Sequence, residues 1–187
     1  MNDEIIIVSG LPRSGTSLMM QMLAAGGIDV LTDGERSADI DNPRGYLEFE
    51  RVKKIKQDAS WLPTARGKAV KMISQLLFDL PATESYRVLF MERNLEEILE
   101  SQEKMLANLG RLAVPRDKMR SAFESHLQRL DEWLSKQSSF ATLRIDYPSL
   151  VAHAREEAAR VNQFLSGRAD ANEMAMAVDP SLYRNRR

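Results

Sequence analysis

Residues 5–25 read IIIVSGLPRSGTSLMMQMLAA, and this stretch contains three structural signals in a row. Residues 5–8 form a short β-branched run, which is typical of a strand buried on both faces of a parallel sheet. Residues 9–16 hold two glycines, a proline and several hydroxyl side chains, as a tight loop does. Residues 17–25 then show helical spacing of apolar side chains, with two glycines behind them as a stop. The stretch predicts a strand, a loop and a helix in direct succession.

The same alternation of strand and helix continues along the chain. Further buried strands are expected at residues 87–91 (RVLFM) and 140–145 (FATLRI), with a weaker one at 69–73 (AVKMI). Helices are expected over residues 95–109, with Asn94 as the cap, and over residues 115–136 and 148–165. This order predicts a parallel sheet with helices on its faces. We therefore expect a three-layer αβα fold with a central, mostly parallel sheet, like that of P-loop nucleoside triphosphatases, in a single domain over residues 1–187.

The composition excludes several classes of protein. Of 187 residues, 28% are charged and 43% hydrophobic, which is a globular balance. With no cysteine and two histidines, His126 and His153, we expect no disulfide and no metal site. A net charge of −1 argues against broad nucleic-acid binding. The longest clean apolar run, residues 5–8, is too short to cross a bilayer, and no basic signal-peptide start precedes it. We therefore expect a cytoplasmic protein without membrane insertion.

The loop after the first strand has the features of an anion site. A strand that feeds a tight loop into a helix N-terminus directs several backbone N–H groups at one point, which suits a phosphate or a sulfate. Gly10 and Gly15 have the GxxxxG spacing of nucleotide-binding loops, but Thr16 stands where a triphosphatase has its lysine. Arg13 supplies the cation instead. Because a magnesium-bound triphosphate needs that lysine, the loop favours a less charged anhydride.

Two motifs resemble those of sulfotransferases that use 3′-phosphoadenosine 5′-phosphosulfate (PAPS). Residues 12–19, PRSGTSLM, resemble the 5′-phosphosulfate loop of this family. Arg93 follows a buried strand, and Ser101 stands eight residues later on a helix, which resembles the family's 3′-phosphate motif. The resemblance covers most of residues 5–165, although only these two motifs are specific. It implies that PAPS is the sulfuryl donor, held by Arg13, Ser14, Gly15, Thr16 and Ser17 at its 5′ end and by Arg93 and Ser101 at its 3′ end.

The resemblance also suggests residues for the transfer step. Many members end a strand with Lys-Thr-His, and the comparable place here begins with Lys71 and has Ile73 where the histidine base would stand. Lys71 is therefore expected to contact the sulfonate, unless it is an ordinary surface lysine. Other members use glutamate as the base. Glu48, which we expect in the first turn of a helix after a turn at residues 42–46, is the first candidate, and Glu35 is the second. Either carboxylate could instead be structural, because acids favour helix starts.

The chain departs from the family at the 3′-phosphate end. Glutamates surround Arg93, and their negative charge would oppose a 3′-phosphate. A salt bridge with Glu96 or Glu97 would be the preferred interpretation of this arginine in the absence of the loop motif, but with the loop present we favour the phosphate contact. The basic, glycine-containing segment found near the C-terminus of most members is missing. Arg184 or Arg186 in the tail is the candidate substitute, on charge alone.

Three functions remain open at this stage. The first is a PAPS-dependent sulfotransferase acting on a small-molecule or carbohydrate-like acceptor. The second is a nucleotide or small-molecule kinase on the same fold, for which Ser17 and Glu92 provide only part of a magnesium site. The third is a sulfotransferase-like binding module without turnover. Tyr46, Phe49 and Trp61 belong either to an acceptor pocket or to the core. The sequence leaves the acceptor and the formation of a homo-oligomer undetermined.

Overall fold

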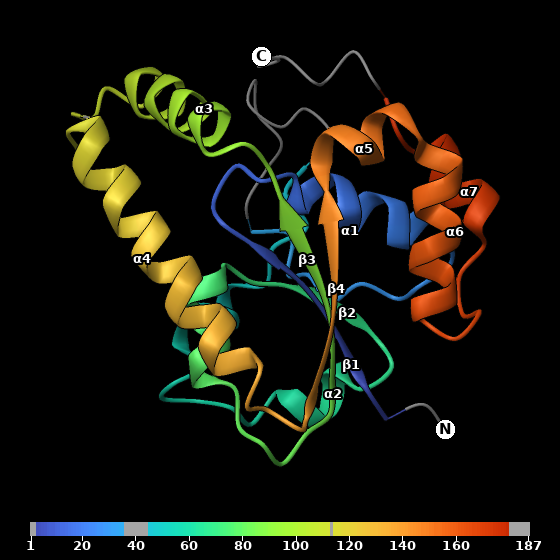
Figure 1. Cartoon of the computed structure of the whole chain (residues 1–187). Helices are drawn as coiled ribbons and strands as arrows, with labels where there is room; N and C mark the ends of the chain where they lie inside the picture. Colours follow the sequence, from blue (N-terminus) through green and yellow to red (C-terminus); the bar gives the residue numbers. More distant parts are fainter. Residues whose placement is uncertain (1–2, 36–44, 113, 180–187) are drawn as a thin grey trace.

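Four parallel strands form the central sheet of the computed structural model, which describes residues 3–35, 45–112 and 114–179. The strands are β1 (Ile5–Gly10), β2 (Ala69–Lys71), β3 (Tyr86–Glu92) and β4 (Phe140–Asp146), and they lie in the order β2-β1-β3-β4 (Figure 1). Ile7 of β1 pairs with Val70 on one side and with Val88 on the other. The predicted parallel sheet is confirmed. The strand expected over residues 69–73 is shorter, because a 3₁₀ helix begins at Ser74.

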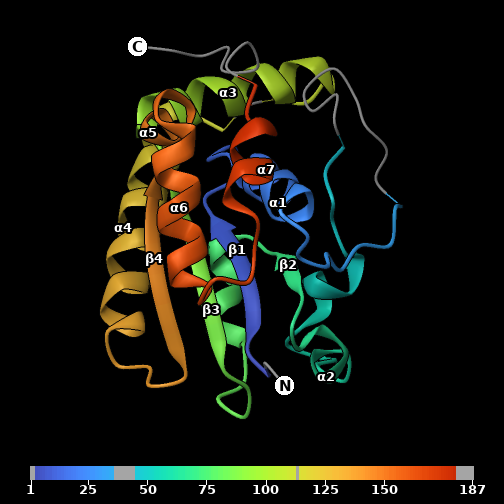
Figure 2. The ribbon, with the colours of Figure 1, turned by 90° about the vertical axis from the view of Figure 1, so that its right-hand side faces the viewer.

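Successive side chains of the strands enter two separate cores on opposite faces of the sheet. Ile6 and Val8 pack under α1 (Thr16–Ala25), α5 (Tyr147–Ala152), α6 (Ala154–Phe164) and α7 (Ala171–Met176). Ile5 and Ile7 pack against the other layer, formed by α4 (Arg116–Leu134), α2 (Leu62–Ala65) and the 3₁₀ helices η1 (Glu50–Lys54) and η2 (Ser74–Asp79). Figures 1 and 2 show the helices on the two sides of the sheet. The expected three-layer α/β fold is therefore present.

Helix α3 (Leu95–Asn108) lies beyond the carboxyl ends of the strands, at the top of both views (Figures 1 and 2). Its predicted cap is confirmed, since the Asn94 side chain accepts a hydrogen bond from the Glu96 N–H at 2.9 Å. This position places the N-terminal half of α3 beside the loop that follows β1.

One helix prediction is wrong. Residues 148–165 do not form one helix, because the chain leaves helical geometry at His153, with φ −128° and ψ 49°. The two resulting helices, α5 and α6, each bury an apolar stripe of their own in the same core. The short elements α2, η2 and α7, of four to six residues each, were not expected, because periodicity needs a longer window. No helix in the described part of the chain is long and apolar enough to span a membrane.

Candidate active site

The loop between β1 and α1 turns sharply through left-handed backbone conformations. Gly10 has φ 151°, Arg13 φ 71° and Gly15 φ 102°. Residues with a Cβ atom rarely adopt such values. A Cβ atom on Gly15 would lie 2.2 Å from Cδ2 of Tyr147, so only glycine fits there. Helix α1 begins at the next residue. The first N–H groups of a helix have no acceptor within the helix, so they can donate hydrogen bonds to an anion bound at the helix N-terminus.

Arg13 and Arg93 connect this loop to α3. Arg13 donates a hydrogen bond from Nε to Oγ of Ser101 at 2.9 Å. Arg93 donates from Nε to a carboxylate oxygen of Glu97 at 2.8 Å and from Nη1 to the backbone carbonyl of Arg13 at 3.3 Å. The Arg93 guanidinium also lies 4.8 Å from the centre of the Tyr147 ring. The structure thus brings Arg13, Arg93 and Ser101 together, and it contains the salt bridge from Arg93 to Glu97 as well.

Lys71, at the carboxyl end of β2, reaches across to the start of α1. Its Nζ donates to Oγ of Ser17 at 3.2 Å and to the backbone carbonyl of Tyr46. The same atom forms an ion pair with Oε1 of Glu48 at 3.2 Å. The two side chains are only 9% and 20% exposed, so water screens their attraction less than at an open surface. Lys71 is therefore not a surface lysine, and it contacts Glu48, the first candidate for the general base.

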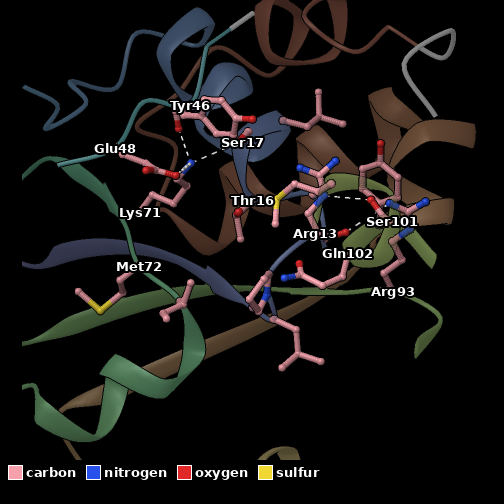
Figure 3. Close-up of a pocket in the computed structure, with 18 of the residues that line it drawn as sticks. Arg13, Thr16, Ser17, Tyr46, Glu48, Lys71, Met72, Arg93, Ser101 and Gln102 are labelled. Atoms are coloured by element: carbon pink, nitrogen blue, oxygen red, sulfur yellow. Dashed lines mark hydrogen bonds and ion pairs between the residues drawn. The ribbon is translucent and has the colours of Figure 1, made fainter. Parts of the chain in front are cut away.

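One cavity of about 810 Å³ holds both groups of residues. This volume lies in the upper part of the roughly 300–1,000 Å³ range of ligand pockets. In Figure 3, Lys71 and Glu48 lie at one end, Arg93 and Ser101 lie at the other, and Thr16 lies between them. The expected site residues that line the cavity are Arg13, Gly15, Thr16, Ser17, Glu48, Lys71, Arg93 and Ser101.

Two of the candidate residues do not line this cavity. Ser14 is fully buried, and its Oγ lies 2.4 Å from the place of a Cβ atom on Gly10, so the hydroxyl faces the sheet. Its N–H donates to the carbonyl of Leu11 at 3.2 Å, which helps to close the turn. Ser14 therefore shapes the loop and does not present its hydroxyl to the cavity. Glu35 is exposed and lies outside the lining.

The chain around Glu48 differs from the expected helix start. Helix η1 begins at Glu50, so Glu48 precedes it. The Glu48 carbonyl accepts hydrogen bonds from Oγ1 of Thr32 at 2.9 Å and from the N–H of Asp33 at 3.2 Å. These bonds to a distant segment hold residue 48 outside the helix. Residues 42–44 of the expected turn lie outside the described residues, as do Arg184 and Arg186.

The cavity also contains residues that the sequence analysis did not assign. Oε1 of Gln102 is buried and has no hydrogen-bond partner within the described ranges, so it suits a donor group on a ligand. Tyr147 directly follows β4, and the rule that ligands bind beyond the carboxyl ends of strands would have suggested it. Of the three candidate aromatic residues, Tyr46 and Phe49 line the cavity, whereas Trp61 is 1% exposed and belongs to the core.

Among residues 3–35, 45–112 and 114–179, no three or more His, Cys, Asp or Glu side chains come together in a metal-binding arrangement. Glu92, half of the partial magnesium site of the kinase alternative, forms an ion pair with Arg144 and does not line the cavity. Ser17, the other half of that site, does line the cavity.

Solved structures include a domain with a similar fold. No protein-family model matches the sequence, and no curated protein sequence matches it. Among solved structures, the sulfotransferase domain from the curacin biosynthetic pathway superposes with a TM-score of 0.57 over 96% of this chain and 88% of that domain, at 18% sequence identity. The two share a fold. An identity this low carries no statement about donor or acceptor.

Proposed function

We propose that this protein is a sulfotransferase that moves a sulfuryl group from PAPS to a hydroxyl group of an acceptor. One observation carries the proposal: a single cavity joins the loop after β1 to Arg93 and Ser101 at one end and to the Lys71–Glu48 pair at the other. The fold shared with a sulfotransferase domain supports it.

The arginine-containing end of the cavity suits the two anionic groups of PAPS. Arg13, the hydroxyls of Thr16 and Ser17, and the N-terminus of α1 would hold the 5′-phosphosulfate. Arg93 and Ser101, which meet Arg13 at this end, would hold the 3′-phosphate. Arginine matches such groups well, because its fork of donors fits the paired oxygens of a phosphate.

The other end of the cavity provides the groups that sulfuryl transfer requires. The acceptor oxygen forms a bond to sulfur, and its proton passes to the Glu48 carboxylate, which acts as a general base. The bond between sulfur and the bridging phosphate oxygen breaks, and the electron pair stays on that oxygen. Lys71, in contact with both Ser17 and Glu48, places positive charge where negative charge develops on the sulfonate.

Titration calorimetry with adenosine 3′,5′-bisphosphate, the product left after transfer, tests this proposal. We expect binding that is independent of magnesium and at least about tenfold weaker in Arg13→Ala, since an arginine–phosphate contact is lost. Arg51→Ala is the control, because Arg51 pairs with Asp58 at the surface and does not line the cavity. ATP binding that requires magnesium would support the kinase alternative. Binding of no adenosine phosphate would support the binding module.

A further inference from the structure

The cavity has an apolar wall next to the Lys71–Glu48 pair. The segments that carry these two residues continue directly into hydrocarbon side chains. Beyond Glu48 the wall consists of Phe49 and Val52, and beyond Lys71 it consists of Met72, Ile73 and Leu76. Figure 3 shows Met72 below Lys71, at the same end of the cavity. The wall therefore borders the position at which the proposed acceptor must present its hydroxyl.

Most of this wall is fixed by the core behind it. Val52 and Met72 are each 3% exposed and belong to the core under η1 and α2. The Phe49 ring lies edge-on to buried Trp61, with 5.4 Å between the ring centres. Ile73 differs, because 45% of its surface is exposed although it lines a cavity. An exposed apolar group that continues a fixed apolar wall is typical of a binding surface.

The charged side chains around this end already have partners of opposite sign. Lys53, close to Glu48 in the chain, pairs with Glu50 at 2.5 Å, in addition to the Lys71–Glu48 pair. A sugar ring carries hydroxyls on all sides, and each one loses stability when it leaves water without a hydrogen-bond partner. The hydrocarbon wall offers no such partners. This wall thus disfavours a carbohydrate-like acceptor at the Lys71–Glu48 end.

We propose that the acceptor is a neutral alcohol with an apolar body, which lies on Phe49, Met72 and Ile73 with its hydroxyl directed at Glu48. This inference rests on the proposed function, because it concerns the acceptor of that same transfer. Burial of the hydrocarbon body against the wall supplies the affinity, and the single hydroxyl meets the single base.

Calorimetry on protein saturated with adenosine 3′,5′-bisphosphate tests the inference, with 2-naphthol as the apolar probe and N-acetylglucosamine as the polar probe. We expect 2-naphthol to bind and the sugar not to bind. Ile73→Asn should weaken 2-naphthol binding by about tenfold or more, the range seen when a hydrophobic pocket loses fit. Met176→Asn is the matched control, because Met176 is 69% exposed and does not line this cavity.

The outcomes separate the two proposals. Binding of the bisphosphate by the Ile73→Asn variant, within about twofold of wild type, would establish that the variant is folded. The inference alone fails if the loaded protein does not bind 2-naphthol, if it binds the sugar more tightly, or if Ile73→Asn and Met176→Asn weaken 2-naphthol binding equally. Failure of wild-type protein to bind the bisphosphate would instead contradict the proposed function, and the acceptor class with it.

Discussion

Arg13 contributes to the site through its backbone and its side chain separately. Its backbone has φ 71°, which for a residue with a Cβ atom costs roughly 1–2 kcal/mol. In this conformation the Arg13 carbonyl accepts a hydrogen bond from Arg93, while the side chain donates to Ser101. Arg13 is therefore held by two contacts, one from Ser101 of α3 to its side chain and one from Arg93 to its backbone. Strain of this kind, supported by its surroundings, is common at functional sites.

Replacing Glu48 by glutamine should stop turnover without affecting donor binding. Glutamine keeps the shape of the side chain but accepts no proton, so we expect kcat to fall by at least about 100-fold. The affinity for adenosine 3′,5′-bisphosphate should stay unchanged. Transfer of radiolabelled sulfate from PAPS measures the first effect, and calorimetry measures the second. Glu50→Gln, two residues away and outside the cavity lining, should remain active. Wild-type turnover in Glu48→Gln would remove this residue from the mechanism.

Gly15 and Gly27 provide a matched pair for testing the loop. Both have positive φ, 102° and 84°, but a Cβ atom on Gly15 collides with the Tyr147 ring, whereas one on Gly27 meets nothing within 4 Å. Gly27→Ala should therefore lower the free energy of unfolding by about 1 kcal/mol through strain alone. Gly15→Ala should lower it by clearly more and abolish bisphosphate binding. Urea denaturation compares the two variants, and equal losses would contradict the close packing of the loop against Tyr147.

At the scale of whole elements, α3 supplies one side of the arginine-containing end of the site. Ser101, the seventh residue of the helix, contacts Arg13, and Met105, one turn further along α3, also lines the cavity. The Asn94 cap fixes where this helix starts and therefore where Ser101 lies.

The sequence predicted those elements whose signals are local. The apolar run before Arg93 and the cap at Asn94 identified β3 and the start of α3 within one or two residues. The break at His153 was missed, because residues 148–165 keep a helical pattern through it. Hydrogen bonds between residues distant in the chain could not be predicted from the sequence either. Glu48 stays outside a helix because its carbonyl accepts hydrogen bonds from residues 32–33. The Lys71–Glu48 contact likewise depends on the tertiary arrangement.

The contact between α4 and η2 should make stability depend on pH. Nε2 of buried His126 lies 2.8 Å from Oγ of Ser74. Burial, with a smaller contribution from Arg129, lowers the pKa of His126 below 6.5. The unfolded chain then takes up this proton before the folded protein does. The stabilisation from neutral His126 is therefore complete above about pH 6.5 and is lost as the pH falls through the lowered pKa.

Urea denaturation between about pH 7 and about pH 5 measures this effect. We expect the free energy of unfolding to decrease more steeply in wild type than in His126→Gln, which keeps a hydrogen-bonding group but does not titrate. Parallel curves for the two proteins would contradict a role for His126.

At the scale of the whole molecule, the cavity is built from segments spread over nearly the entire described chain. Its lining includes the loop after β1, the segment before η1, the end of β2, α3 and Tyr147 after β4. No single layer of the fold contains the site. A ligand that fills the cavity therefore connects these segments and opposes unfolding of the molecule as a whole.

Ligand binding should accordingly raise the stability of the complete protein. At a free concentration 100 times its dissociation constant, adenosine 3′,5′-bisphosphate should add about 2.7 kcal/mol to the free energy of unfolding. The same concentration of adenosine 5′-monophosphate should add less, because it lacks the group assigned to Arg93 and Ser101. Thermal denaturation with each ligand measures the difference. Equal stabilisation by both nucleotides would contradict the assignment of these two residues.

The most direct test is a crystal structure of the protein with adenosine 3′,5′-bisphosphate. We expect the 5′-phosphate to lie within hydrogen-bond distance, about 2.7–3.2 Å, of the N–H groups at the start of α1, and the 3′-phosphate to lie beside Arg93 and Ser101. A nucleotide bound elsewhere, or a phosphate that does not contact the loop after β1, would contradict the account.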